Sequence, residues 1–249
     1  MFTAEGRERL REQLISAAGA DGRISGAAHL GSAALEQQDE WSDIDLALCL
    51  APEASFETVL EDWTTRLYRD CGVVAHLDVR RGEILYRVFL LENTLQIDIS
   101  FWPAADFRAV GPKFKLLFGA ANEPRPAPVP DARDLIGMGW LYALHVRSAL
   151  ARGRRLQAEY MLSGMRNEML ALACRRQGLV AVQGRGMDEL PREFQARVAR
   201  CFPQSLDRME LGRAFAETTE ALLAEIGFAD AELAGRLWGV LREMAGGTW

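Results

Sequence analysis

Two hydrophobic periods alternate along the first half of the chain, and together they predict a mixed α/β segment. Residues 4–19 and 56–69 have the apolar spacing of amphipathic helices, with Ser55 as the expected N-cap of the second. Short apolar runs bounded by turn residues predict strands at 23–31, where the run ends in a turn at Gly31, and at 44–50, 73–79, 84–91 and 95–101. The Glu92-Asn93-Thr94 step makes the last two strands a hairpin.

The second half of the chain has only the helical period. Four prolines between residues 119 and 130 exclude a helix or a central strand there and indicate a domain boundary. After it, helices are expected at about 131–152, 155–176, 188–200, 206–226 and 229–245. The predicted fold class is α+β (mixed α/β): residues 1–125 form a mixed sheet flanked by helices, and residues 126–249 form an all-α bundle.

Composition and charge exclude several classes of protein. With 249 residues, 49% of them hydrophobic, the chain can bury a sizeable core. It has no apolar run long enough to span a bilayer, and its charged N-terminus is unlike a secretory signal, so a cytoplasmic location is expected. The four cysteines are scattered, which indicates reduced and mostly buried thiols. A net charge of −6 argues against a nonspecific nucleic-acid binder.

Three carboxylates interrupt otherwise apolar strands. Asp43 and Asp45 are two positions apart and therefore project from one face, and Asp98 lies between Ile97 and Ile99 on a later strand. If the two strands are neighbours, the three acids converge, and protons or divalent cations must neutralise them. Oxygen ligands suit Mg²⁺, which completes its coordination with water and substrate phosphates. The acids therefore predict a phosphate-bearing substrate.

The Gly31-Ser32 step offers a place for that phosphate. It ends the first strand and opens a short helical segment, so its free backbone N–H groups would face the ligand. Taken alone, such a step is usually an ordinary turn with an N-cap serine. Its position twelve residues before Asp43 gives it weight.

These residues carry a resemblance. Gly31-Ser32 followed by Asp43-Ile44-Asp45-Leu46 resembles the hG[GS]…DhDh signature of the DNA polymerase beta-like nucleotidyltransferase superfamily, and QIDIS around Asp98 resembles its third-carboxylate strand. The match covers roughly residues 20 to 110. The length and the two-part layout are similar to those of the small antibiotic (aminoglycoside and lincosamide) nucleotidyltransferases.

The resemblance implies a Mg²⁺-dependent transfer of a nucleoside monophosphate, AMP from ATP in the first instance, to a hydroxyl, with release of pyrophosphate. Asp43 and Asp45 would bridge two Mg²⁺ ions, and Asp98 would complete the first ion's site and help to take up the acceptor's proton. Gly31 and Ser32 would bind the nucleotide. The helical domain would contribute to the acceptor cleft, and the protein would be a monomer or a homodimer.

The general base and the acceptor stay open. Asp78, Glu83 and Glu159 compete with Asp98 for the role of base. Residues 131–187 contain 9 basic and 4 acidic side chains, which favours a small neutral or weakly charged hydroxylated acceptor, antibiotics included, over a polycationic aminoglycoside. Two sets of basic residues are weaker candidates for contacting phosphate or acceptor: Lys113 and Lys115; Arg147, Arg152, Arg154 and Arg155.

Two other functions fit the same residues. One is nucleotidyl transfer to a protein or an RNA end, and the acidic net charge disfavours the RNA version. The other is a non-catalytic NTP-binding or partner module. Three intact acids argue against the second, because a module without chemistry has no use for mutually repelling carboxylates.

Overall fold

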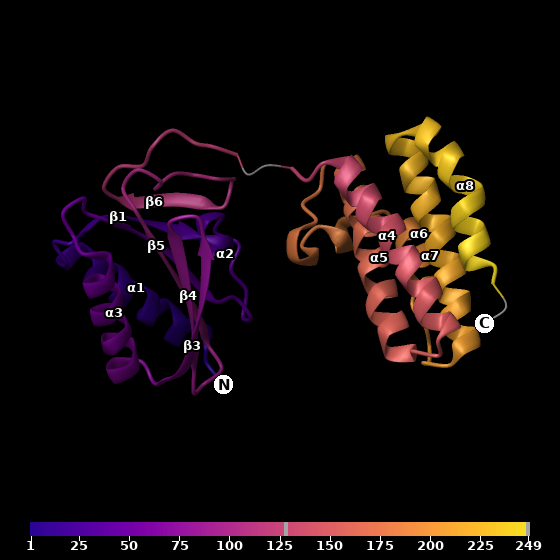
Figure 1. Ribbon diagram of the computed structural model, residues 1–249. Coiled ribbons are helices and arrows are strands. Elements are labelled where there is room, and N and C mark those ends of the chain that lie inside the picture. Colours follow the sequence, from indigo (N-terminus) through magenta and orange to yellow (C-terminus); the bar gives the residue numbers. More distant parts are fainter. Residues whose placement is uncertain (127–128, 248–249) are drawn as a thin grey trace. The chain divides into compact units, whose positions relative to one another are not determined.

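The computed structural model describes residues 1–126 and 129–247, and the chain divides into two compact units, Met1–Pro128 and Val129–Trp249 (Figure 1). The first unit holds the strands and the second is helical. The elements of the first unit are α1 (Ala4–Ala20), β1 (Ile24–Leu30), α2 (Gly31–Ala34), β2 (Ile44–Leu50), α3 (Phe56–Asp70), β3 (Val73–Arg81), β4 (Ile84–Leu91), β5 (Gln96–Trp102) and β6 (Phe114–Phe118).

The strands form one mixed sheet in the order β3-β4-β5-β2-β1-β6. Strands β2 and β5 lie parallel at its centre, and the other neighbouring strands are antiparallel. The predicted hairpin of β4 and β5 is confirmed. This order matters because it places the strand after Asp43 beside the strand that carries Asp98.

One face of the sheet is covered by helices. Helices α1 and α3 pack on it, burying Leu14 and Trp63 together with Leu46, Ile99 and Phe89 of the strands (Figure 1). Ser55 caps α3 as predicted, accepting a hydrogen bond from the Thr58 N–H. The opposite face carries a smaller cluster around Trp102 and Phe107, next to the positions of the three acids.

Strand β6 is absent from the sequence-based prediction. It pairs antiparallel with β1 at the edge of the sheet, aligning Lys115 with His29. Its five residues, FKLLF, break the alternation expected of a strand, and none of them is fully buried. A short edge strand of this kind gives little periodic signal.

The second unit is a helical bundle with a core of its own, as the pattern predicted. Helices α4, α5 and α7 bury Val146, Met165 and Phe215 among its members. The predicted helix at 188–200 begins later, at Arg192, because Pro191 stands at its N-terminus and a short 3-10 turn, η2 (Met187–Glu189), precedes it. The helices are α4 (Ala132–Ala151), α5 (Arg155–Arg176), α6 (Arg192–Arg200), α7 (Arg208–Ala229) and α8 (Ala231–Ala245), with a second 3-10 turn, η1 (Val182–Gly184), between α5 and η2.

Two further expectations concern the whole chain. Cys49, Cys71, Cys174 and Cys201 are all free thiols, and all but Cys71 are buried, as expected. Within residues 1–126 and 129–247, no helix has the length and apolar content needed to cross a membrane.

Candidate active site

Asp45 and Asp98 lie directly opposite each other on the two central parallel strands. The register of β2 and β5 aligns Ile44 with Ile97 and Asp45 with Asp98. Aligned residues in a sheet project from the same face, so the two carboxylates share the face opposite to α1 and α3. The backbone ladder therefore brings together two acids that are 53 positions apart in the sequence.

Asp43 precedes β2 and lies beside the same pair. Its Oδ2 accepts a hydrogen bond from Gln96 Nε2 at 3.1 Å, which ties it to the start of β5. Its charge also acts on Asp98. The structure thus gathers the three acids that the sequence singled out at one end of the two central strands.

Asp98 is strongly affected by its surroundings. Burial, together with the nearby Asp43 carboxylate, raises the pKa of Asp98 to about 6, while the Arg81 guanidinium acts in the opposite direction. Its Oδ1 is buried without a hydrogen-bond partner. A buried carboxylate oxygen of this kind is costly unless a ligand satisfies it.

Gly31 packs against Asp45. It begins α2 with φ at +58°, and a Cβ built on it would meet Asp45 Oδ2 at 1.9 Å. Only glycine tolerates both the left-handed backbone and the contact. Ser32 lies within the single turn of α2, and Leu30 is the N-cap. The serine is therefore not an N-cap, as it would be in an ordinary turn.

A buried arginine fixes the loop that leads into Asp43. Arg7 of α1 is 3% exposed, and its Nη1 donates to the carbonyl oxygens of Asp39 at 2.6 Å and Ser42 at 2.9 Å. Ser42 in turn donates to Asp39 Oδ1 at 2.8 Å. Sequence reasoning missed Arg7, because a basic residue in an amphipathic helix gives no sign that it turns inward.

The two lysines near β6 differ in their contacts. Lys115 pairs with Glu36, just after α2, at 2.5 Å, which places a cation close to the Gly31-Ser32 turn. Lys113 is exposed before β6. Arg147, Arg152, Arg154 and Arg155 lie exposed around the turn between α4 and α5, which fits a solvated helix end.

The acids suit a divalent cation whose coordination a substrate completes. Among the described residues, no group of three His, Cys, Asp or Glu side chains forms a ready-made metal site. The oxygen-only donors, the mutual repulsion and the unpartnered Asp98 oxygen nevertheless fit Mg²⁺, which is typically held by one or two carboxylates plus phosphate oxygens and water. The residues therefore fit the ion that the sequence implied.

Asp78 does not join this cluster, which corrects its proposed role as general base. In β3 it aligns with Arg87 of β4, and Arg87 projects toward α3, where it donates to Thr64 Oγ1 at 2.6 Å. Asp78 accepts two hydrogen bonds from Arg87, and this guanidinium lowers the pKa of the carboxyl. Because side chains alternate along a strand, Asp78 projects from the face of the sheet that does not carry Asp98.

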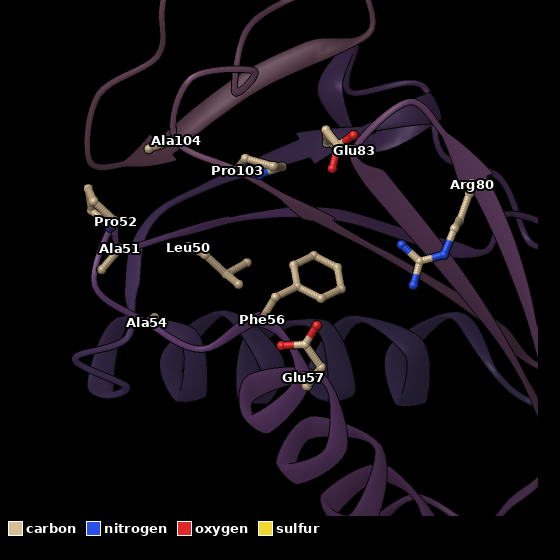
Figure 2. Close-up of a pocket in the computed structure, with 10 residues that line it drawn as sticks. All are labelled: Leu50, Ala51, Pro52, Ala54, Phe56, Glu57, Arg80, Glu83, Pro103 and Ala104. Carbon is tan, nitrogen blue, oxygen red and sulfur yellow. The ribbon is translucent and has the colours of Figure 1, made fainter.

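Glu83 is also distant from the acids. It lies in the turn between β3 and β4 and lines a cavity of about 320 Å³, with Phe56 and Arg80 among its walls (Figure 2). The cavity adjoins Leu50 and Pro103, beyond the carboxyl ends of β2 and β5, whereas the acids lie at the amino ends. Glu83 therefore does not belong to the acid cluster.

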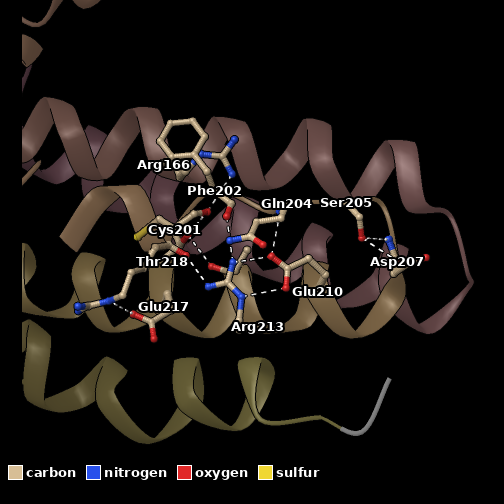
Figure 3. A network of polar contacts seen from close by, with 12 residues as sticks. Arg166, Cys201, Phe202, Gln204, Ser205, Asp207, Glu210, Arg213, Glu217 and Thr218 are labelled. Carbon is tan, nitrogen blue, oxygen red and sulfur yellow. Dashed lines mark hydrogen bonds and ion pairs between the residues drawn. The ribbon is translucent and has the colours of Figure 1, made fainter. Parts of the chain in front are cut away.

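Glu159 belongs to the helical unit, where it pairs with a buried arginine. Arg166, 4% exposed, donates from Nη2 to Glu159 Oε1 at 2.7 Å, while Glu159 Oε2 is buried without a partner. The Arg166 guanidinium also stacks on Phe202, its Cζ 4.4 Å from the ring centroid (Figure 3). One oxygen of this carboxylate is thus held in place, and the other is buried without a hydrogen bond.

The loop beneath Arg166 is held by a second arginine. Arg213 of α7 donates to the carbonyl oxygens of Arg200 at 2.7 Å and Phe202 at 2.9 Å, and it pairs with Glu210 (Figure 3). Charged donors on carbonyls form strong hydrogen bonds. The connection from α6 to α7 is therefore an ordered support for Arg166.

Two further residues on the acid face were not anticipated. Tyr86 of β4 aligns with Ser100, two positions beyond Asp98 in β5. Arg81, at the end of β3, lies over the Tyr86 ring with Cζ 5.8 Å from the centroid. The alternation of ILYRVFLL points to Tyr86, but only the sheet order places it beside Asp98.

Comparisons with known proteins find similarity among solved structures alone. No protein-family model matches the chain, and no curated protein matches it. Among solved structures, an aminoglycoside 6-adenyltransferase from Bacillus subtilis is similar over 93% of this chain and 95% of that chain, with 14% sequence identity and a TM-score of 0.40. At that level of likeness the case for a function rests on the geometry of the acids.

Proposed function

We propose that the protein is a Mg²⁺-dependent nucleotidyltransferase that moves a nucleoside monophosphate, AMP from ATP, to a hydroxyl of a small molecule and releases pyrophosphate. The observation that carries the proposal is the alignment of Asp45 with Asp98 on parallel strands, with Asp43 next to them and Gly31 packed on Asp45. Antibiotics are among the acceptors we would test.

Each acid has a role in this proposal. Asp43 and Asp45 would hold two Mg²⁺ ions, and Asp98 would complete the site on the acceptor's side. Bound Mg²⁺ supplies charge neutralisation for the phosphates and a lowered pKa for the acceptor hydroxyl. The chain's own contribution is to hold the carboxylates in register and to leave the Gly31 backbone open to a phosphate.

The proton of the acceptor hydroxyl needs a carboxylate. Asp98 adjoins the proposed metal site, and its Oδ1 is buried without a hydrogen-bond partner, which leaves that oxygen available to receive the proton. Glu159 has one oxygen fixed by Arg166 and one without a partner. We propose Asp98 for this role. Glu159 stays a prediction from the sequence, and a pH profile of turnover that Glu159→Gln leaves unchanged would support Asp98 as the base.

The experiment uses ATP, Mg²⁺ and a panel of hydroxylated acceptors, and follows the release of pyrophosphate. Asp43→Asn and Asp45→Asn are expected to lower turnover at least about a hundredfold, because each removes a metal-binding charge. Glu61→Gln, an exposed acid of α3, is the matched control and is expected to keep full activity. Unchanged turnover in Asp43→Asn and Asp45→Asn would overturn the proposal.

A further inference from the structure

The order of the strands gives the candidate active site two distinct sides. From the acids on β2 and β5, β1 and the Gly31-Ser32 turn lie on one side, and β4 and β3 lie on the other. The proposed function places the leaving pyrophosphate over the turn. Since phosphoryl transfer proceeds in line, the attacking hydroxyl must then enter over β4 and β3.

The surface that this hydroxyl would cross is apolar. Val88 of β4 aligns with Asp98, and Leu77 and Val79 of β3 align with Val88 and Tyr86, so all of these side chains share the acid face. Leu77 is 64% exposed and Val79 is 40% exposed. Exposed aliphatic residues grouped beside an acid cluster are typical of a surface that meets a ligand.

One charge stands on this surface. Arg81 is the charged residue that strands β3 and β4 place on the acid face, and it acts electrostatically on both Asp98 and Tyr86. Its neighbour Arg80 projects to the other face, where its Cζ lies 5.9 Å from the centroid of the Phe56 ring. The approach to Asp98 therefore combines aliphatic side chains, one aromatic ring and one fixed positive charge.

We propose that the exposed face of β3 and β4, formed by Leu77, Val79, Arg81, Tyr86 and Val88, is the acceptor subsite, and that it selects a neutral hydroxylated molecule with an apolar or planar portion beside the hydroxyl. The inference rests on the proposed function for the direction of attack. The residues of the subsite and its selectivity go beyond the proposed function. A polycationic acceptor is disfavoured because Arg81 repels it and these two strands offer no carboxylate on this face.

The first test compares acceptors. Aryl and alkyl glycosides serve as neutral probes, and kanamycin and streptomycin serve as polycationic probes, with AMP transfer from ATP read by mass spectrometry. The wild type is expected to modify the neutral probes at least about tenfold faster, the ratio expected for about 1.4 kcal/mol of charge repulsion. Faster modification of the polycationic probes would overturn the proposal.

The second test changes the charge. Arg81→Glu is expected to shift the ratio of cationic to neutral turnover at least about tenfold toward the cationic probes. Arg80→Glu is the matched control, because it makes the same charge change one residue away on the opposite face. An equal shift in both variants, or none in Arg81→Glu, would contradict the assignment.

A third measurement separates this inference from the proposed function. The neutral probes are titrated into the protein with Mg²⁺ but without ATP, and backbone amide resonances are followed by NMR. Perturbations are expected at Val79, Tyr86 and Val88, and not in Val88→Glu, even if no probe is ever nucleotidylated. If no neutral probe shifts these resonances, the subsite is wrong. Release of pyrophosphate that depends on Asp43 would still support the proposed function.

Discussion

The carboxylate of Asp45 occupies the space in which a side chain on residue 31 would begin. An ideal Cβ at Gly31 lies 1.9 Å from Asp45 Oδ2 and 2.9 Å from its Cγ. The first strand and the acid-bearing strand are therefore fitted to each other at this point. Any residue larger than glycine must displace the Asp45 carboxylate from this position.

Gly31→Ala is expected to abolish most activity while leaving the fold in place. The alanine costs about 1 kcal/mol for its left-handed backbone, and in addition it displaces Asp45. Gly82→Ala is the control, because Gly82 has φ at +60° with nothing within 4 Å of its Cβ position. Pyrophosphate release should fall at least about tenfold further in Gly31→Ala than in Gly82→Ala, and equal activities would contradict the account.

Replacing Arg7 should disturb Asp43 from a distance. Arg7→Gln loses the charged hydrogen bonds to the Asp39 and Ser42 carbonyls, and the cost in unfolding free energy should be about 2 kcal/mol. At a temperature where the variant is folded, it should need more Mg²⁺ for half-maximal activity. Arg9→Gln changes an exposed arginine of the same helix and should match the wild type. If Arg7→Gln and Arg9→Gln need the same Mg²⁺ concentration, the loop that leads into Asp43 keeps its conformation without Arg7.

Asp21 should make the stability of the first unit depend on acid pH. Hydrogen bonds from Arg23, and one from Trp63 Nε1 at 3.2 Å, lower the pKa of Asp21 from 3.8 to about 2. Because the folded pKa is the lower one, the stabilisation is complete above about pH 4 and is lost as the pH falls toward 2. Urea unfolding should show Asp21→Asn less stable by on the order of 1 to 2 kcal/mol near neutral pH, and this difference should shrink below about pH 4.

The control for Asp21 is Asp70→Asn. Asp70 pairs with Arg69 on an exposed part of α3, where an ion pair contributes little to stability. Its effect on unfolding should be small across the same pH range. A difference for Asp21→Asn that does not change with pH would show that packing, and not charge, carries its contribution.

The helical unit has an ion pair between a buried acid, Glu225, and an arginine at the surface, Arg176, and the two residues should respond unequally to substitution. Glu225, 3% exposed, accepts from Arg176 Nε at 2.9 Å and Nη2 at 3.0 Å. Arg176→Met should cost about 3 kcal/mol, because it leaves an unpaired buried carboxylate. Arg176→Met combined with Glu225→Gln should recover part of that loss in a denaturation experiment. A double variant less stable than Arg176→Met would contradict this reading.

Most of the fold could be predicted from periodicity, and the acid cluster could be predicted in part. The apolar runs around Asp45 and Asp98 mark their strands, but only the parallel pairing of β2 and β5 brings the two acids opposite each other. Asp78 lies on an equally clear strand and was one of the four candidates for the general base. A shift of one position along a strand moves a side chain to the other face, and the pairing with Arg87 places Asp78 on the face away from Asp98. The sequence does not reveal that pairing.

Residues that act through long-range contacts gave no such signal. Arg7 resembles any basic residue of an amphipathic helix, and its carbonyl partners lie 32 and 35 positions away. Arg81 and Arg80 are adjacent and identical in type, yet they serve opposite faces of β3. Physical reasoning from sequence finds such residues only after the sheet order is known.

The position of β3 at the edge of the sheet has a consequence for how such a protein changes over time. The acids are fixed by the backbone ladder of two central strands, whereas Leu77 and Val79 project from an edge strand into solvent. Substitutions on that outer surface cost the fold little. The outer surface of β3 can therefore change, by natural drift or in a directed-evolution library, while the positions of the three acids stay as they are.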